Sequence, residues 1–443
     1  MGLMKKNVIT TSACFLCLLL CVAQADLLGF LKSLDKGHRH SSATQNTQND
    51  GPRPNTPKPS NVPAAPVTGP GAFDVSKLGA VGDGKTENSK AFQKAWNAAC
   101  SFAGKSTVVV PAGGEFLLGA ITFEGPCSHG SPSFVIQGTL KAVPQRSAFP
   151  EDAWMEFVHL DGLTMSGGGI VDGQGQDTWD GDGCPDHKCK SPPINLKFRK
   201  VNNSEIHDLY VRDSKGFHIN FYGCENVRIY NMDISSPEDS PNTDGIHISR
   251  STNIHISNCN IGVGDDCISI GAGNHGITVD KVFCGPGHGI SVGSLGKYDD
   301  EEPVSDIYVS DCTLVGTTNG VRIKTWPGSP VVQADNFTFE DITMSNVQFP
   351  IIIDQKYCPS RRCSNEPSNV KISNIVYKNI KGTSFSKLAV NLACSAAFPC
   401  QNIQLADIDL TYQDPNDKVR SLCYNAHVSA SGVQNPPPCL IKQ

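Results

Sequence analysis

The sequence predicts an all-β chain wound as a single-stranded parallel β-helix, a solenoid, with a short helix capping its N-terminal end. Three observations lead to this prediction. From about residue 130 onward, short stretches of alternating apolar residues are separated by Gly, Asn and Asp. Related nine-residue segments recur there, with starts 27, 23, 30, 30, 33 and 33 residues apart. These segments show no helical periodicity, and the intervals are short for the four strands of a propeller blade.

The repeated segments begin with a polar residue or glycine and continue with alternating apolar positions. They are NVRIYNMDI from Asn226, NIHISNCNI from Asn253, GITVDKVFC from Gly276, DIYVSDCTL from Asp306, NFTFEDITM from Asn336, NVKISNIVY from Asn369 and NIQLADIDL from Asn402. In the second segment we expect Ile254 and Ile256 to face the interior, followed after a bend by Cys259 and Ile261. Cys312 holds the same position as Cys259, so we expect both to be buried apolar residues rather than a disulfide or metal site.

An open solenoid end exposes strand edges and core, so it needs a cap. The segment TENSKAFQKAWNAAC, residues 86–100, predicts a helix there, because its apolar residues share one helical face. These residues are Ala91, Phe92, Ala95, Trp96 and Ala99. We expect Cys100 to pin this helix, with Cys127 as a candidate partner. Other close pairs suggest small staples, although spacing alone does not give the connectivity: Cys184 with Cys189, Cys358 with Cys363, Cys394 with Cys400, and Cys423 with Cys439.

The first residues predict export. Two lysines precede an apolar run, Ala13–Val22, which is followed by Ala-Gln-Ala, a small-x-small cleavage pattern. That run is too short to span a membrane, and no other stretch is long and apolar enough. We therefore expect a signal peptide over residues 1–25, a secreted extracellular protein starting near Asp26, and no membrane association after the signal is removed.

Residues 26–70 are rich in Asn, Thr, Gln, Pro and Ser and cannot bury enough apolar surface to fold. We interpret them as a linker, spacer or removable pro-segment ahead of one β-helix domain over residues 71–443.

The composition agrees with an oxidising destination, because the chain carries 18 cysteines. Three of them leave with the signal peptide, so an odd number remains and at least one thiol is free or pairs with another molecule. A formal net charge of −6 argues against a general nucleic-acid-binding protein. We expect a monomer.

Four polar motifs depart from the apolar pattern and fall on successive coils. NTDG holds Asn242 and Asp244, GDDC holds Asp265 and Asp266, GPGHG holds His288, and RIK holds Arg322 and Lys324. Asp244 and Asp265 are 21 residues apart, and Asp266 and His288 are 22 apart. Residues one coil apart stack at about 4.8 Å, so we expect one outer groove to carry three carboxylates, an imidazole and two cations.

Each motif alone has an ordinary interpretation. An Asp at a corner usually bonds its own backbone, a His between glycines is usually a turn residue, and Arg-x-Lys is usually a solvated strand face. Four motifs stacked in one place are better explained by chemistry that uses two carboxylates. A carboxyl beside like charges has a raised pKa and can act as a general acid. We therefore expect repulsion to keep Asp265 protonated while Asp266 stays a base.

In this order and spacing, NTDG, GDDC, GHG and RIK resemble the motifs of the polygalacturonases, pectin-hydrolysing glycoside hydrolases built on a right-handed parallel β-helix. The resemblance covers nearly the whole chain after the linker, including FDVSKLGAVGDGKTENSKAFQKAWNAAC and GGGIVDGQG. The four motifs together are highly specific. The resemblance implies hydrolysis of α-1,4 linkages in polygalacturonate with inversion, without a metal or other cofactor.

The resemblance also implies roles for the acidic residues and the histidine. Asp265 is expected to protonate the leaving glycosidic oxygen as the general acid. Asp244 and Asp266 are expected to hold and activate the attacking water. His288 is expected to tune the protonation of the acid.

The same resemblance implies a substrate-binding set. Arg322 and Lys324 are expected to bind the galacturonate carboxylate at the cleavage point, a suitable use of fixed cations for an anionic sugar. Asn242 and Tyr357 are expected to contact substrate.

Two further sets of residues concern the covalent structure. Cys267 and Cys284 resemble the family disulfide that fixes the loop carrying His288. Two sequons, at Asn202 in NNS and Asn336 in NFT, are candidate glycosylation sites.

Three alternatives stay open at this point. A rhamnogalacturonan hydrolase would share the family, although the Arg-x-Lys pair favours galacturonate. A pectate lyase would use Ca²⁺, and the cations Arg322 and Lys324 beside the acidic cluster argue against that. A non-enzymatic wall protein is disfavoured by the intact acid, base and cation set.

The residues alone do not distinguish endo from exo action. They also do not determine the tolerance of methyl-esterified substrate or the stereochemical outcome. Stacking on adjacent coils suggests the short carboxylate separation of retaining enzymes, whereas the resemblance implies inversion.

Overall fold

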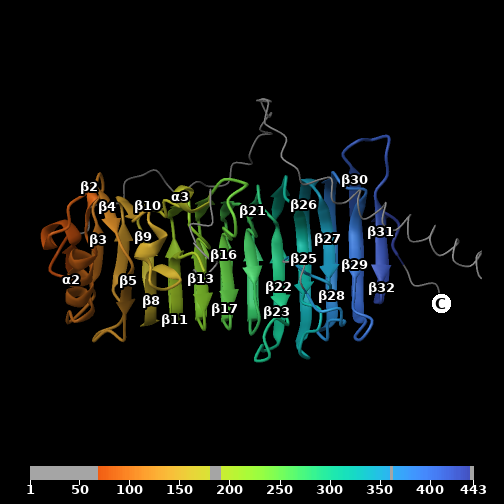
Figure 1. Cartoon of the computed structure of the whole chain (residues 1–443), viewed down its shortest axis with the longest axis horizontal. Helices are drawn as coiled ribbons and strands as arrows, with labels where there is room; N and C mark the ends of the chain where they lie inside the picture. The colour runs from red at the N-terminus through yellow and green to blue at the C-terminus, as the bar shows by residue number, and fades with distance from the viewer. Residues whose placement is uncertain (1–67, 180–190, 360–362, 440–443) are drawn as a thin grey trace, which may run out of the picture. The chain divides into compact units, whose positions relative to one another are not determined.

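A computed structural model describes residues 68–179, 191–359 and 363–439. In this part the chain winds into successive coils of parallel strands (Figure 1), as the sequence predicts. The predicted signal peptide and nearly all of the predicted linker lie outside the described residues, as does the candidate pair Cys184–Cys189. Within the described part, no helix combines the length and apolar character that crossing a membrane requires.

Each coil contributes strands to three parallel faces. The face that carries the site, called here the groove face, contains β5 (Ile121–Glu124), β8 (Ala153–Asp161), β13 (Ile219–Tyr222), β16 (Ile246–Ser249), β19 (Ile268–Ile270), β22 (Ile290–Leu295), β25 (Asn319–Thr325), β27 (Phe349–Asp354), β29 (Leu388–Ala393) and β31 (Arg420–Tyr424). The second face contains β1 (Ala72–Asp74), β3 (Thr107–Val110), β6 (Ser133–Ile136), β9 (Thr164–Ser166), β14 (Glu225–Tyr230), β17 (Thr252–Ser257), β20 (His275–Asp280), β23 (Val304–Ser310) and β32 (Ala426–Asn435).

The third face contains β2 (Asp83–Glu87), β4 (Glu115–Leu118), β7 (Thr139–Ala142), β10 (Ile170–Asp172), β12 (Tyr210–Arg212), β15 (Asp233–Ser235), β18 (Asn260–Gly262), β21 (Phe283–Cys284) and β24 (Thr313–Val315). Long strands join two faces: β11 (Ile194–His207), β26 (Gln333–Val347), β28 (Lys371–Ser384) and β30 (Cys400–Tyr412). The short helical segments are η1 (Val75–Leu78), α2 (Ser89–Cys100), η2 (Arg146–Ala148) and α3 (Gln176–Trp179). Parallel crossovers of this kind are right-handed, so the fold is a right-handed parallel β-helix.

The repeat in the sequence has a conformational cause. Left-handed backbone recurs at pairs of residues five positions apart, and in the six Asn and Asp pairs named below φ lies between 47° and 62°. The pairs are Asn226 and Asn231, Asn253 and Asn258, Asp306 and Asp311, Asn336 and Asp341, Asn374 and Asn379, and Asn402 and Asp407. Asn, Asp and Gly adopt this conformation at least cost. Asn side chains also link neighbouring coils: the amide nitrogen of Asn253 donates to Asn226 at 3.1 Å.

One predicted repeat is out of register. Phe337 pairs with Ile375, so Asn374, not Asn369, occupies the position of Asn336 on the next coil. NVKIS and NIVYK show the same alternation, and the local pattern therefore does not distinguish them. The connection before β28 is longer than the predicted period allows.

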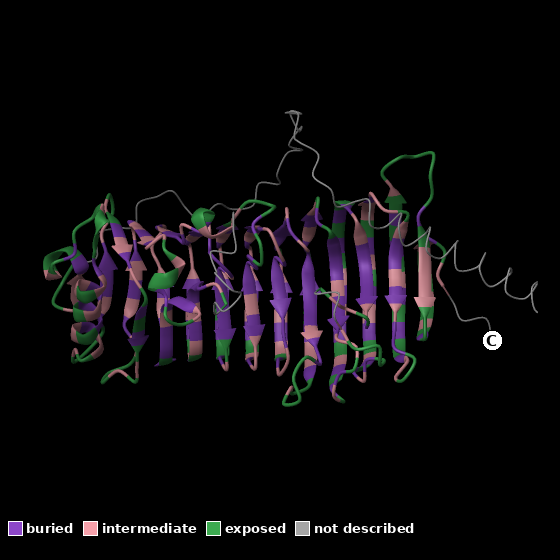
Figure 2. Ribbon diagram, in the orientation of Figure 1, coloured by how far each residue is buried: buried purple, intermediate pink, exposed green. Residues whose placement is uncertain are grey.

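The alternating apolar residues fill the inside of the coils, and Figure 2 shows buried residues along the strands interrupted by intermediate and exposed ones. At the N-terminal end, α2 covers the core as predicted. Trp96 is buried against Phe123, with ring centroids 5.2 Å apart, and its indole Nε1 donates to the Glu124 carbonyl at 3.0 Å. Phe92, Ala95 and Ala99 are buried with it, which confirms the cap.

The described cysteines bear out the predicted pairs and the prediction of unpaired thiols. Disulfides join Cys100 to Cys127, Cys267 to Cys284, Cys358 to Cys363, Cys394 to Cys400, and Cys423 to Cys439. Among the described cysteines, Cys224, Cys259 and Cys312 form no disulfide, and all three are buried. Burial raises the pKa of Cys259 and Cys312 to about 12, so both stay thiols and act as core residues.

Candidate active site

The predicted site residues come together where the third face passes into the groove face. Asp244 precedes β16, Asp265 and Asp266 precede β19, His288 precedes β22, and Arg322 and Lys324 lie on β25. A cavity of about 580 Å³ is lined by Asp244, Asp265, Asp266, Lys324 and Tyr357, together with Asn242, Trp326 and neighbouring residues. His288 and Arg322 adjoin this cavity through their contacts with Asp265 and Asp266. The structure thus brings the predicted residues together, and their roles stay predictions.

Glycines allow the coils to approach closely here. His288 stands between Gly287, with φ of +148°, and Gly289, with φ of +87°. A Cβ on Gly289 would lie 2.1 Å from the Asn319 carbonyl oxygen on the next coil. The two glycines of the GHG motif are therefore needed for this backbone conformation and for the close approach of the coils, whatever the role of the His288 imidazole.

Asp266 is the most enclosed carboxylate, with 1% of its side chain exposed. Its Oδ1 accepts from Arg322 Nη2 at 2.7 Å and from Ser291 Oγ at 2.8 Å, and its Oδ2 accepts from Lys324 Nζ at 2.6 Å. Burial acts to raise the pKa of Asp266, but Lys324 and Arg322 outweigh it and lower that pKa to about 2. Asp266 is therefore a permanent anion at ordinary pH.

Asp244 has the opposite balance. It is buried, and its Oδ2 accepts one hydrogen bond, from Ser269 Oγ at 2.6 Å. Burial first, and then the charges of Asp265 and Asp266, raise the pKa of Asp244 well above its ordinary value. Asp244 thus holds a proton more readily than Asp266.

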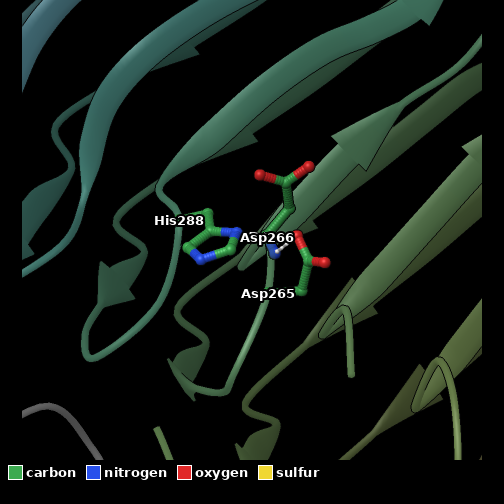
Figure 3. A group of neighbouring side chains, drawn as sticks. All are labelled: Asp265, Asp266 and His288. Atoms are coloured by element: carbon green, nitrogen blue, oxygen red, sulfur yellow. Dashed lines mark hydrogen bonds and ion pairs between the residues drawn. The ribbon is translucent and has the colours of Figure 1, made fainter. Parts of the chain in front are cut away.

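Asp265 is half-buried and faces His288. His288 Nδ1 lies 2.9 Å from Asp265 Oδ1, which also accepts from the Asp266 backbone N–H at 2.8 Å (Figure 3). The His288 backbone N–H donates to the Asp265 carbonyl, also at 2.8 Å. These contacts fix both side chains, while Asp265 stays open to the cavity.

Tyr357 lies above the two cations. The Lys324 Nζ is 5.1 Å from the Tyr357 ring centroid, and the Arg322 guanidinium carbon is 6.0 Å from it. Tyr357 also meets Trp326 edge-on, with centroids 5.7 Å apart. The aromatic ring shields the cations from water, which strengthens their attraction for an anionic group.

The remaining predicted residues lie in three different surroundings, and their roles stay predictions. Asn242 is exposed, has left-handed backbone with φ of 54°, and lines the cavity. The disulfide between Cys267 and Cys284 ties β21, just before the His288 loop, to the segment that carries the paired aspartates. Of the sequons, Asn336 is exposed and Asn202 is half-buried.

Three groups that touch the site were not predicted from the sequence. Ser269 and Ser291 bond Asp244 and Asp266, and His247 bonds Ser269 through Nδ1 at 2.7 Å. All three sit in outward positions within or beside the recognised motifs. The signal was a spacing: each serine follows its aspartate by 25 residues.

The donor set suits acid–base chemistry better than a metal ion. Asp265, Asp266 and His288 place ligand atoms within 4.8 Å of one another. Both oxygens of Asp266, however, already accept from cationic side chains, and a divalent cation there would face Arg322 and Lys324.

Comparison with known proteins gives the family. A profile of Glycosyl hydrolases family 28 matches residues 100–432. A polygalacturonase from Gossypium barbadense is 46% identical over 84% of this chain and 91% of its own length. An exopolygalacturonase from Platanus acerifolia is 45% identical over 82% of this chain and 96% of its own.

Solved structures agree with this assignment. The crystal structure of an endo-xylogalacturonan hydrolase from Aspergillus tubingensis superposes with a TM-score of 0.70 and 27% identity, covering 82% of this chain and 100% of that one. The polygalacturonase from Erwinia carotovora shares the fold, with a TM-score of 0.66 at 24% identity over 83% of this chain and 100% of that one. The chain belongs to glycosyl hydrolases family 28.

Proposed function

We propose that the protein is a secreted polygalacturonase that hydrolyses α-1,4-galacturonosyl linkages of pectin, with inversion, during cell-wall remodelling. Its relatives include proteins named polygalacturonase and exopolygalacturonase. The observation that carries the proposal is the placement of Arg322 and Lys324 against the catalytic carboxylates. Fixed, aromatic-shielded cations beside an acid–base set suit a substrate whose every sugar carries a carboxylate.

The mechanism follows from the differing surroundings of the three carboxyl groups. Asp265, held by His288, donates its proton to the glycosidic oxygen as the bond to the anomeric carbon breaks. Asp244 and Asp266 hold the attacking water; Asp244, whose pKa is raised, accepts its proton. Asp266 stays ionised and stabilises the positive charge that develops on the sugar.

Hydrolysis is tested with purified protein on polygalacturonate. We expect new reducing ends without ultraviolet-absorbing unsaturated product, the same rate in a chelator, and β-configured product by NMR. Chelator-sensitive release of unsaturated product would instead establish a lyase. Faster cleavage of rhamnogalacturonan than of polygalacturonate would make the protein a rhamnogalacturonan hydrolase of the same family. Product sizes separate exo action, which releases monomer from the start, from endo action.

We expect Lys324→Ala to raise KM for polygalacturonate by about 10- to 100-fold, because a charge-assisted contact with the substrate carboxylate is lost. The effect on a highly methyl-esterified polymer should be smaller, because the ester carries no charge. Lys378→Ala is the matched control: its ion pair with Glu340, at 3.1 Å, lies outside the cavity lining. Equal losses on both polymers would remove the carboxylate-binding role.

A further inference from the structure

Two hydrogen-bonded chains of the same form lead to the two buried aspartates. On the groove face, His247 pairs with Ser269, Ser269 with Ser291, and Ser291 with Arg322, so these four side chains form one column across β16, β19, β22 and β25. Each serine donates its hydroxyl to the aspartate that lies 25 residues before it.

Each serine also receives a hydrogen bond from a neighbour in the column. Arg322 Nε donates to Ser291 Oγ at 2.9 Å, and His247 Nδ1 lies 2.7 Å from Ser269 Oγ. A serine hydroxyl carries one proton, and that of Ser269 is directed at Asp244 Oδ2. When Asp244 is ionised, as a proton acceptor must be, His247 is therefore the donor, with its proton on Nδ1.

The His247 ring is held in this orientation by packing. It stacks on Phe217 with centroids 5.0 Å apart and planes at 28°. His247 also lines the cavity, and no described side chain forms a hydrogen bond with its Nε2.

We propose that His247 and Ser269 are positioning residues that hold Asp244 through the chain Nδ1–H···Oγ–H···Oδ2, leaving its other oxygen to accept a proton from the attacking water. The proposal rests on the proposed function. It assigns to Asp244 a neutral counterpart of the Arg322–Ser291 chain that holds Asp266.

The difference between the two chains explains why one aspartate is a base and the other a fixed anion. The charged groups that face Asp244 are Asp265, Asp266 and, more weakly, Lys324. His218 Nδ1 lies 3.0 Å from the Asp244 carbonyl oxygen; burial lowers the pKa of His218 to about 4. Burial and then Lys324 likewise lower the pKa of His247 to about 4, so both imidazoles are neutral. Asp244 thus gains a hydrogen bond without a compensating cation.

The test compares Ser269→Ala with the wild-type protein on polygalacturonate. We expect kcat to fall by about 10- to 100-fold while KM changes by less than about threefold, because Asp244 loses orientation but the substrate keeps its contacts. The bond from Ser269 lowers the pKa of Asp244, so its loss raises that pKa further. Because Asp244 must be ionised to accept a proton, the acid limb of the kcat/KM profile should move to higher pH.

Two substitutions of His247 separate the effect of its hydrogen bond to Ser269 from the effect of its ring packing on Phe217. His247→Phe keeps the stacking on Phe217 but removes the donor that orients Ser269, so it should lower kcat and move the acid limb in the same direction as Ser269→Ala, by a smaller amount. His247→Asn places an amide N–H near the position of Nδ1 and should restore much of kcat. The pH profile requires only residual activity, so a lower melting temperature does not obscure it.

Ser305→Ala is the matched control. It removes a contact of the same kind, His275 Nδ1 to Ser305 Oγ at 2.8 Å, from residues outside the cavity lining, and should leave the profile unchanged. An unchanged kcat and acid limb in Ser269→Ala would overturn the inference and leave the proposed function intact. A folded wild-type protein without activity on polygalacturonate would overturn both.

Discussion

Asp265→Asn is expected to lower kcat on polygalacturonate by about 10³- to 10⁴-fold, because an amide has no acidic proton to give to the leaving oxygen. The substituted side chain keeps an oxygen that can accept from His288 Nδ1 and from the Asp266 backbone N–H, as Asp265 Oδ1 does. The variant should therefore fold and bind the polymer as the wild type does. Rates come from reducing-end assays, binding from titration with the polymer, and folding from thermal melts.

A second aspartate–histidine pair, outside the cavity, serves as the control for Asp265→Asn. It shows whether the loss of kcat comes merely from breaking a contact between an aspartate and a histidine. Asp280 accepts from His255 Nε2 and lies outside the cavity lining. Asp280→Asn should leave kcat within about twofold. If Asp265→Asn instead turned over substrate at the wild-type rate, the assignment of Asp265 as general acid would be wrong.

The fold was predictable because its cause is local. Left-handed corners favour Asn and Asp at fixed positions, and the strand between two corners must alternate to send every second residue inward. Both signals are visible in Asn226 and Asn231 or in Asn253 and Asn258. The register at Asn369 was not predictable, because it depends on the pairing of β28 with β26, a contact between segments far apart in sequence.

The residues of the site were predictable from their motifs, but the hydrogen bonds and ion pairs that join them across coils were not. Asp266 looked repelled by Asp265, whereas its nearest charges are Arg322 and Lys324, 56 and 58 residues later. Only the register between coils reveals that compensation. The prediction that Asp265 carries the acidic proton stays a prediction, and the structure adds Asp244 as the carboxyl whose pKa burial and like charge raise.

Ser269 and Ser291 illustrate the same limit. Each occupies an outward strand position, where serine is usually solvated. A periodic pattern separates inward from outward residues, but the choice of outward partner depends on how successive coils are offset. The recurrence of an Asp–Ser spacing of 25 residues was the available signal, and it acquires meaning only beside the geometry.

Asp266 contributes to the stability of the fold and also belongs to the site. Its variants should therefore lose both stability and activity, and the two losses can be measured separately. In the folded protein the pKa of Asp266 is lowered to about 2 from an ordinary 3.8. A lowered folded-state pKa stabilises the fold above the ordinary value, and this stabilisation is lost as the pH falls from about 4 toward 2. The shift corresponds to about 2 kcal/mol at neutral pH. Acid unfolding followed by circular dichroism should include this component in the wild type.

Asp266→Asn is expected to lower the free energy of unfolding at pH 7 by about 3 to 5 kcal/mol, because Arg322 and Lys324 would stay buried without an anion. It should also lower kcat by about 10²- to 10⁴-fold, because the fixed anion near the developing positive charge is gone. Urea melts and reducing-end assays measure the two effects.

The double variant Asp266→Asn/Lys324→Met separates the two roles. Replacing one of the uncompensated cations by a neutral side chain of similar length removes part of the electrostatic strain, so stability should recover toward that of the wild type. Activity should not recover, because the variant lacks both the anion proposed to stabilise the reacting sugar and a cation proposed to bind its carboxylate. Recovery of both would mean that Asp266 only balances charge. Recovery of neither stability nor activity would contradict the assignment of Lys324 as an electrostatic partner of Asp266.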